Sequence, residues 1–145
     1  MIRFLFLIIS IISLSVNYLI FNSNTLEKYI LYDARNDLHN FKFNYFQPIH
    51  YSFPTLASNS VPLATYISRY ATNEKDFDFA IDLLNISLVY NPYSIYSKYL
   101  LARNYIYKTD YIKALEYLEE IFQESPKIEA TTSLYIAIIS ELKDS

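Results

Sequence analysis

The pattern of apolar and polar positions is most regular between residues 95 and 127, IYSKYLLARNYIYKTDYIKALEYLEEIFQESPK. Apolar and aromatic residues recur there at the three- and four-residue spacing of an amphipathic helix. This spacing predicts two helices joined by a tight turn. The first would bury Leu101, Ala102 and Tyr105, and the second would bury Ala114, Leu118 and Ile121.

The same pattern occurs one period upstream and, in part, downstream. A shift of 34 residues aligns Asp76 with Asp110, Ala80 with Ala114, Leu84 with Leu118 and Pro92 with Pro126, and carries Ile67 to Leu101 and then Tyr135. A constant period of this length is typical of a helical solenoid, in which each unit buries its apolar face against its neighbours. We therefore predict an all-α fold with the repeats in residues 61–145. We expect Ala80 and Ala114 at close helix crossings. An ordinary helical bundle with accidental periodicity is the alternative.

Local signals predict where the second helix of each pair begins and ends. Asp76 and Asp110 suit the N-cap position, where a side-chain oxygen accepts a hydrogen bond from a backbone N–H. Pro92 and Pro126 would stop these helices, because proline cannot continue them. The pattern over residues 128–142 predicts a last helix. We expect this helix to cover the open end of the stack with Leu134, Ile138 and Ile139.

These residues give the chain a resemblance to the tetratricopeptide repeat, a pair of helices with a 34-residue period. The matching positions are Leu101, Ala102, Tyr105, Ala114, Leu118, Ile121 and Pro126 in one copy and Ile67, Ser68, Ala71, Ala80, Leu84, Ser87 and Pro92 in the other. The chain departs from the family at the early aromatic position, which is Ala64 or Lys98, and lacks the turn glycine near Lys75 and Thr109. The resemblance implies stacked hairpins whose first helices line a concave, peptide-binding side.

Composition removes several classes of function. The chain of 145 residues contains no glycine and no cysteine, although glycine averages about 7% of protein residues. Glycine-rich phosphate-binding loops are therefore excluded, as are disulfides, thiol catalysis and cysteine-ligated zinc. The formal net charge of −3 gives no basic footprint for nucleic acid. We expect no cofactor, no metal ion and no nucleic-acid partner.

Residues 4–21, FLFLIISIISLSVNYLIF, form an apolar run long enough to cross a bilayer core as a helix. We predict that residues 1–22 are a retained, single-pass membrane anchor. A cleaved signal peptide and a buried core helix are the alternatives, and no A-x-A cleavage pattern follows the run. Arg3 precedes the run, whereas Lys28 and Arg35 follow it, and we expect the repeat domain outside the cytoplasm.

Residues 23–60 are interpreted as a helical connector and a loop. Asn24 and Glu27 resemble a capping box, which predicts that a new helix begins at Asn24. Residues 41–46, FKFNYF, alternate like a strand, but no partner strand is evident in the sequence and we expect a helix. A loop before the first repeat is predicted by Pro48, Pro54 and Pro62.

Three short segments, FPTL at 53–56, VP at 61–62 and NPYS at 91–94, follow an apolar helix and accompany degenerate repeats. In this they resemble the tail of bacterial O-antigen polymerases and ligases, in which a repeat-like periplasmic segment follows the last transmembrane helices. Those enzymes need many transmembrane helices, and this sequence has at most one apolar run of that length. The resemblance implies an alternative function, as an accessory or truncated piece of a glycopolymer-assembly protein.

No residue pattern points to catalysis. His39 and His50 have no E-x-x-H partner, and we interpret them as polar surface or loop residues rather than metal ligands or acid–base groups. Glu116, Glu119 and Glu120 crowd one helix like a set of acid–base carboxylates, but a solvated helix face is the simpler interpretation. We predict that the chain is not an enzyme.

The candidate site is the concave side of the repeats. Arg69 and Arg103 are 34 residues apart, so they should stack in register on neighbouring first helices. Tyr96, Tyr99 and Tyr107 lie on or near the same helix face as Arg103. Paired guanidinium groups beside tyrosines suit a carboxylate, a phosphate or an acidic peptide.

Two alternatives stay open for these side chains. Each arginine could pair with a local acid, such as Asp76 or Asp110, and only stabilise its hairpin. The tyrosines could equally fill space between helices. Our prediction is a membrane-tethered scaffold or adaptor for a protein or peptide partner, with a ligand-free structural stub as a further option. Because two and a half repeats make a short stack, a homo-oligomer formed through an exposed end is also considered.

Overall fold

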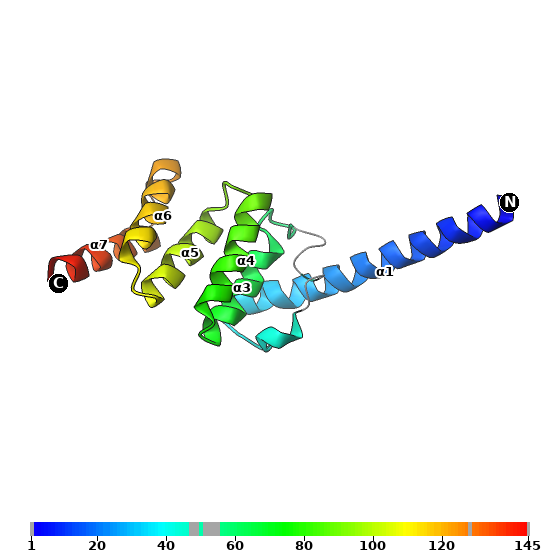
Figure 1. Cartoon of the computed structure of the whole chain (residues 1–145), viewed down its shortest axis with the longest axis horizontal. Helices are drawn as coiled ribbons and strands as arrows, with labels where there is room; N and C mark the ends of the chain where they lie inside the picture. Colours follow the sequence, from blue (N-terminus) through cyan, green and yellow to red (C-terminus); the bar gives the residue numbers. More distant parts are fainter. Residues whose placement is uncertain (1, 47–49, 51–55, 128, 145) are drawn as a thin grey trace.

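The computed structural model describes residues 2–46, 50, 56–127 and 129–144. Over these residues the chain is all-helical, with no strand and one isolated bridge between Leu56 and Pro62. The elements are α1 (Ile2–Arg35), the 3₁₀ turn η1 (Phe43–Tyr45), α3 (Leu63–Asn73), α4 (Phe77–Tyr90), α5 (Ile95–Tyr107), α6 (Tyr111–Glu124) and α7 (Glu129–Asp144). In Figure 1, α3 to α7 form a row, α1 projects from one end of it, and the termini lie at opposite ends. The predicted all-α class is confirmed for this part of the chain.

Helix α1 runs without a break from the apolar run into the folded part of the molecule. The predicted helix start at Asn24 is therefore wrong, and the expected boundary at residue 22 lies inside one helix. No cap is needed there, because a residue within a helix finds its hydrogen-bond partners in the preceding turn. Thr25, for example, donates its hydroxyl to the carbonyl of Phe21 at 2.9 Å.

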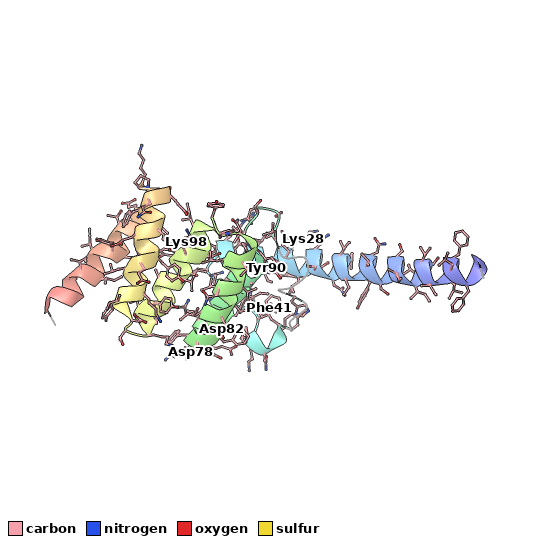
Figure 2. All side chains as sticks on the ribbon, turned by 45° about the horizontal axis from the view of Figure 1, so that its top comes forward. Lys28, Phe41, Asp78, Asp82, Tyr90 and Lys98 are labelled. Atoms are coloured by element: carbon pink, nitrogen blue, oxygen red, sulfur yellow. The ribbon has the colours of Figure 1, made fainter. Side chains whose placement is uncertain are left out.

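The two halves of α1 have opposite surroundings. Its first half is apolar enough to cross a membrane, and none of that apolar window is buried. Figure 2 shows these side chains projecting from a part of the helix that has no other element beside it. Further along, α1 packs on α3 and buries Leu26 and Ile30 in the core of the first hairpin, together with Leu63, Ile67 and Tyr70.

Each helical hairpin closes through the same tight turn. After α3, the backbone N–H of Lys75 donates to the Thr72 carbonyl, and that of Asp76 donates to the Ala71 carbonyl, both at 3.0 Å. The equivalent bonds after α5 run from Thr109 to Ile106 at 2.8 Å and from Asp110 to Tyr105 at 2.9 Å. This pair of bonds is the Schellman motif, whose turn residue takes the left-handed conformation that glycine favours. Lys75 (φ 66°) and Thr109 (φ 60°) hold that position in this glycine-free chain.

The residue after each left-handed position opens the next helix. Asp76 and Asp110 each accept a hydrogen bond from the backbone N–H three residues ahead, at 3.2 and 3.3 Å. Both predicted N-caps are confirmed. Helices α4 and α6 then end two residues before Pro92 and Pro126, as predicted.

Consecutive helices pack on one another along the row, and α3 also packs on α5. Ala80 and Ala114 are fully buried, as expected for residues at close helix crossings. Side-chain hydrogen bonds join the two first helices directly, between Thr65 and Ser97 at 2.7 Å and from Thr72 to Asn104 at 2.9 Å. Helices α3 and α5 therefore lie side by side.

Helix α7 closes the far end of the row by packing on α6. Its Ile138 is buried and Leu134 is partly buried in the same cluster, which confirms the expected cover for these two residues. Ile139 is only partly buried, and Ile136 is 63% exposed. The cover over this end of the stack is thus incomplete along α7.

The helix expected over residues 41–46 is reduced to the single turn η1. Side-chain burial explains the difference, because Phe46 is buried against Tyr70 with ring centroids 4.8 Å apart. The backbone N–H of Phe43 donates at 2.6 Å to the carboxylate of Glu74, the residue that caps the end of α3, where a continuing helix would use its own carbonyls. Residues 53–55 of the FPTL segment, together with Pro48 and Pro54, lie outside the described residues.

Candidate functional site

A cavity of about 390 Å³ lies between α3, α5 and the segment that follows α1. Its lining residues are Asp37, His39, Arg69, Thr72, Asn73, Lys75, Phe77, Leu100, Arg103, Asn104 and Tyr107. We call this set the α3–α5 groove. Its volume lies within the range of about 300–1,000 Å³ that is usual for ligand pockets. Both predicted arginines contribute to it.

Arg69 forms the buried end of the groove. Its side chain is 9% exposed, and its Nη2 donates to Oδ1 of Asp37 at 2.8 Å. The Asp37 side chain is itself 93% exposed. Arg69 therefore pairs with an acid, as the alternative interpretation proposed, but that acid is Asp37 and neither Asp76 nor Asp110. Those two carboxylates cap helices. The partner, Asp37, lies in the turn that follows α1, more than thirty residues away.

Arg103 lies one repeat further along and has different partners. Its Nη2 donates to the hydroxyl of Tyr107 at 2.9 Å. Its guanidinium carbon is 5.8 Å from the ring centroid of Tyr99 and 5.9 Å from that of Tyr107, within the range of cation–π attraction. Among the described residues, no carboxylate forms an ion pair with Arg103. Two tyrosines therefore hold the guanidinium group in place, and no described carboxylate neutralises its positive charge.

The charge of the groove is positive overall. Arg69, Lys75 and Arg103 line it, whereas Asp37 is the one carboxylate among its described lining residues. His39 also lines the groove, and burial, reinforced by the positive charge of Arg69, lowers the pKa of its imidazole. The neutral form of His39 is thereby favoured at neutral pH. The described lining residues include three positive side chains and one negative side chain, so their net charge of +2 attracts an anion.

The five predicted site residues are only partly brought together. Arg69, Arg103 and Tyr107 line the groove, and Tyr99 contacts Arg103 without lining it. Tyr96 instead packs on Tyr66, with ring centroids 5.7 Å apart, and lines a separate cavity. Burial raises the pKa of the Tyr96 hydroxyl. Tyr96 therefore fills space between helices, which was the alternative interpretation of the tyrosines.

Sequence reasoning missed the acids at the end of α1. Asp33 is buried and accepts hydrogen bonds from the Tyr70 hydroxyl at 2.8 Å and from the backbone and side-chain amides of Asn40 at 2.9 and 2.7 Å. Burial, together with this bond, raises the pKa of Tyr70. A signal was present in the sequence, because Asp33 follows Leu26 and Ile30 at helical spacing and so lies on their buried face.

The other residues considered for chemistry separate in space. His39 lines the α3–α5 groove, whereas His50 stacks on Tyr45 at 6.0 Å in another part of the molecule. Over the described residues, no group of three or more His, Cys, Asp and Glu side chains is arranged to hold a metal ion.

The glutamates of α6 have two different roles. Glu116 and Glu119 are exposed, as expected for a solvated face. Glu120 instead forms an ion pair with the buried Lys98 of α5 at 2.9 Å, and Glu124 approaches the same ammonium at 2.7 Å. Lys98 therefore joins α5 and α6 through ion pairs.

Comparison of the chain with protein-family models, curated proteins and solved structures yields no match.

Proposed function

We propose that the chain is a single-pass membrane protein whose repeats of tetratricopeptide type form an interaction module, and that the α3–α5 groove binds an acidic segment of a partner protein. The observation that carries this proposal is the charge of the groove, in which Arg69, Lys75 and Arg103 face a single described carboxylate, Asp37. A concave site with one buried guanidinium group and a second, partly exposed one beside aromatic rings suits carboxylates, because the planar fork donates paired hydrogen bonds.

Arg103 is the residue best suited to test the groove. Arg69 is buried and paired, so its loss would leave Asp37 without its partner, whereas Arg103 is partly exposed and has no carboxylate partner among the described residues. A hydrogen bond to a charged group contributes about 1.5–3 kcal/mol. Replacing Arg103 by glutamine should therefore weaken binding of an acidic peptide by roughly 10- to 100-fold.

The experiment uses the full chain in lipid nanodiscs and fluorescence anisotropy with two dye-labelled peptides. One peptide is rich in aspartate and glutamate, and the other carries asparagine and glutamine at the same positions. We expect binding of the acidic peptide, loss of this binding in Arg103→Gln, and no change in the matched control Arg35→Gln, which removes an exposed arginine outside the groove. Equal binding of the two peptides, or full binding by Arg103→Gln, would overturn the proposal.

The exposed first half of α1 supports the anchoring part of the proposal. Eighteen residues from Phe4 to Phe21 give a helical length of about 27 Å, close to the thickness of a bilayer core. Soluble proteins rarely expose a continuous apolar surface of this size. Alkaline extraction of membranes, with the intact mass of the mature chain, tests retention of the anchor. A mature chain that lacks residues 1–22 would instead establish cleavage of a signal peptide.

Protease protection tests the proposed position of the repeats outside the cytoplasm. In right-side-out vesicles, an added protease should degrade the repeat domain. Protection of the domain until the vesicles are lysed would place it in the cytoplasm.

A further inference from the structure

A second cavity, of about 530 Å³, surrounds the point at which α1 emerges from the folded part of the molecule. Its walls include Asn22 and Thr25 of α1, the ring of Tyr29, and the rings of Phe41 and Tyr45 from the segment around η1. We call it the collar pocket. Figure 2 shows Phe41 and Lys28 near this end of α1, next to the start of the bare helix.

The collar pocket directly follows the apolar run. Because a helix rises about 1.5 Å per residue, Asn22 and Thr25 lie roughly 1.5 and 6 Å beyond Phe21 along the helix axis. The headgroup layer of one leaflet is about 5–7 Å thick, from the difference between total and hydrocarbon thickness. Since α1 is unbroken through this region, a bilayer around residues 4–21 would bring its headgroups to the level of Asn22 and Thr25, the side of the pocket nearest the apolar run, whereas Tyr29 lies roughly 12 Å beyond Phe21 on the side toward water.

The chemistry of the pocket suits this level. Tyr29 and Tyr45 are 58% and 53% exposed, and Phe41 links them through an edge contact of 6.4 Å and a stacked contact of 5.0 Å. Exposed tyrosines are enriched at the boundary between membrane and water, where the ring lies in apolar surroundings and the hydroxyl in polar ones. A position at the boundary between membrane and water would therefore account for the exposure of this aromatic cluster.

The polar groups of the pocket point to the class of ligand. The Asn22 amide and the phenol groups offer hydrogen-bond donors, and Lys28 lines the adjoining cavity beside Tyr29 and Phe41. No described carboxylate lines the collar pocket. Lysine near the end of a membrane helix commonly extends its ammonium into the headgroup layer. Donors, a nearby cation and aromatic walls together suit the phosphate and glycerol of a lipid.

We propose that the collar pocket seats the headgroup of a membrane phospholipid, which fixes the depth of the repeat domain on the bilayer. This inference rests on the membrane anchoring proposed above. It goes beyond anchoring because it assigns a lipid-binding role to residues outside the apolar run, on α1 and around η1.

Depth-resolved quenching tests the position of the pocket. Since the chain has no tryptophan, three single-tryptophan variants of the full chain can be compared in phospholipid vesicles: Tyr45→Trp in the pocket, Leu14→Trp in the run and Tyr93→Trp in the exposed loop before α5. Lipids brominated high on the acyl chain should quench Tyr45→Trp, and those brominated near the chain end should quench Leu14→Trp. Tyr93→Trp should stay unquenched.

The outcomes separate the two proposals. If Leu14→Trp is quenched while Tyr45→Trp behaves like Tyr93→Trp, the pocket is not at the headgroups and this inference is overturned, although anchoring stands. If Leu14→Trp is also unquenched, membrane anchoring fails as well.

Lipid retention tests binding itself. The full chain is extracted with a mild detergent from vesicles of phosphatidylcholine and phosphatidylglycerol, and its mass is measured by native mass spectrometry. We expect one retained phospholipid, which is lost in Tyr29→Ser/Tyr45→Ser and kept in the control Tyr93→Ser; all three tyrosines are more than half exposed, so the fold should survive. Equal retention by the double variant and the control would contradict the assignment.

Discussion

Replacement of Thr109 by glycine should stabilise the protein. Thr109 has a φ of 60° in the turn between α5 and α6, a left-handed conformation that is unusual for any residue with a Cβ atom and a genuine outlier for a β-branched one. The turn is imposed from both sides, because the backbone bonds to Ile106 and Tyr105 close α5 while Asp110 caps α6. The residue at this position therefore adopts the left-handed conformation whatever its own preference.

The expected gain follows from two opposing terms. The left-handed conformation costs a residue with a Cβ atom roughly 1–2 kcal/mol. Glycine loses about 0.4–1 kcal/mol through the greater entropy of its unfolded chain. The Thr109 side chain contributes little in return, since it is exposed and its hydroxyl bonds only the neighbouring Lys108 carbonyl. The net gain is about 1 kcal/mol, which raises the Tm by about 4 °C for a domain of this size.

The control is Thr109→Ala, which removes the hydroxyl and the branch but keeps the Cβ atom. Thermal unfolding in detergent micelles, followed by near-ultraviolet circular dichroism, reports on packing through the 16 tyrosines of the chain. Glycine should raise the Tm relative to alanine, and Lys75→Gly should behave in the same way in the first hairpin, where φ is 66°. Equal Tm values for glycine and alanine at position 109 would refute the reasoning.

Three further predictions concern packing, binding and pH. Ala114 is fully buried between helices, so Ala114→Leu should lower the free energy of unfolding by about 1–3 kcal/mol through overpacking; an unchanged denaturation midpoint would contradict the close crossing. Asp37 occupies the guanidinium of Arg69, so Asp37→Asn should strengthen binding of the acidic peptide severalfold in the anisotropy assay, and weaker binding would show that Asp37 orients the arginine instead. Burial lowers the pKa of His39, so the unfolded chain takes up a proton first as the pH falls below about 6.5. Stability should therefore decrease from about pH 7 to about pH 5, and urea unfolding should show a smaller decrease in His39→Gln.

The helices and their ends could be predicted because their signals are local or periodic. The buried alanines, the aspartate caps and the helix-ending prolines recur at one interval, and each acts on its immediate neighbours. The sequence has no glycine for the turns between helices, and it does not by itself show how those turns close. The Schellman bonds form with Lys75 and Thr109 in the same backbone conformation, so the turn survives at a cost in stability.

The candidate site was less predictable because it depends on contacts between distant segments. The register of Arg69 and Arg103 followed from the period, but the pairing of Arg69 with Asp37 required the end of α1 to lie beside α3. The capping-box signal at Asn24 was misleading for a similar reason. A local start signal has no effect where a helix already continues from the preceding turn.

The connection between α1 and α3 fixes the position of the α3–α5 groove relative to α1. Two neighbouring residues of α3, Arg69 and Tyr70, bind Asp37, which follows α1, and Asp33 in the last turn of α1. The backbone of that turn is closed by a bond from Leu38 to Asp33 at 2.8 Å. The groove is therefore attached to α1 through side-chain and backbone bonds.

Helical geometry converts this attachment into a distance. Arg35 lies fourteen residues beyond Phe21 on the same helix, or roughly 21 Å at 1.5 Å per residue. In the proposed function, the end of α1 that lies beside the α3–α5 groove is then about 14–16 Å beyond the outer edge of the headgroup layer, which itself is about 5–7 Å thick. Under that proposal, a partner would present its acidic segment close to the bilayer, which favours another membrane protein over one that reaches the groove from a distance.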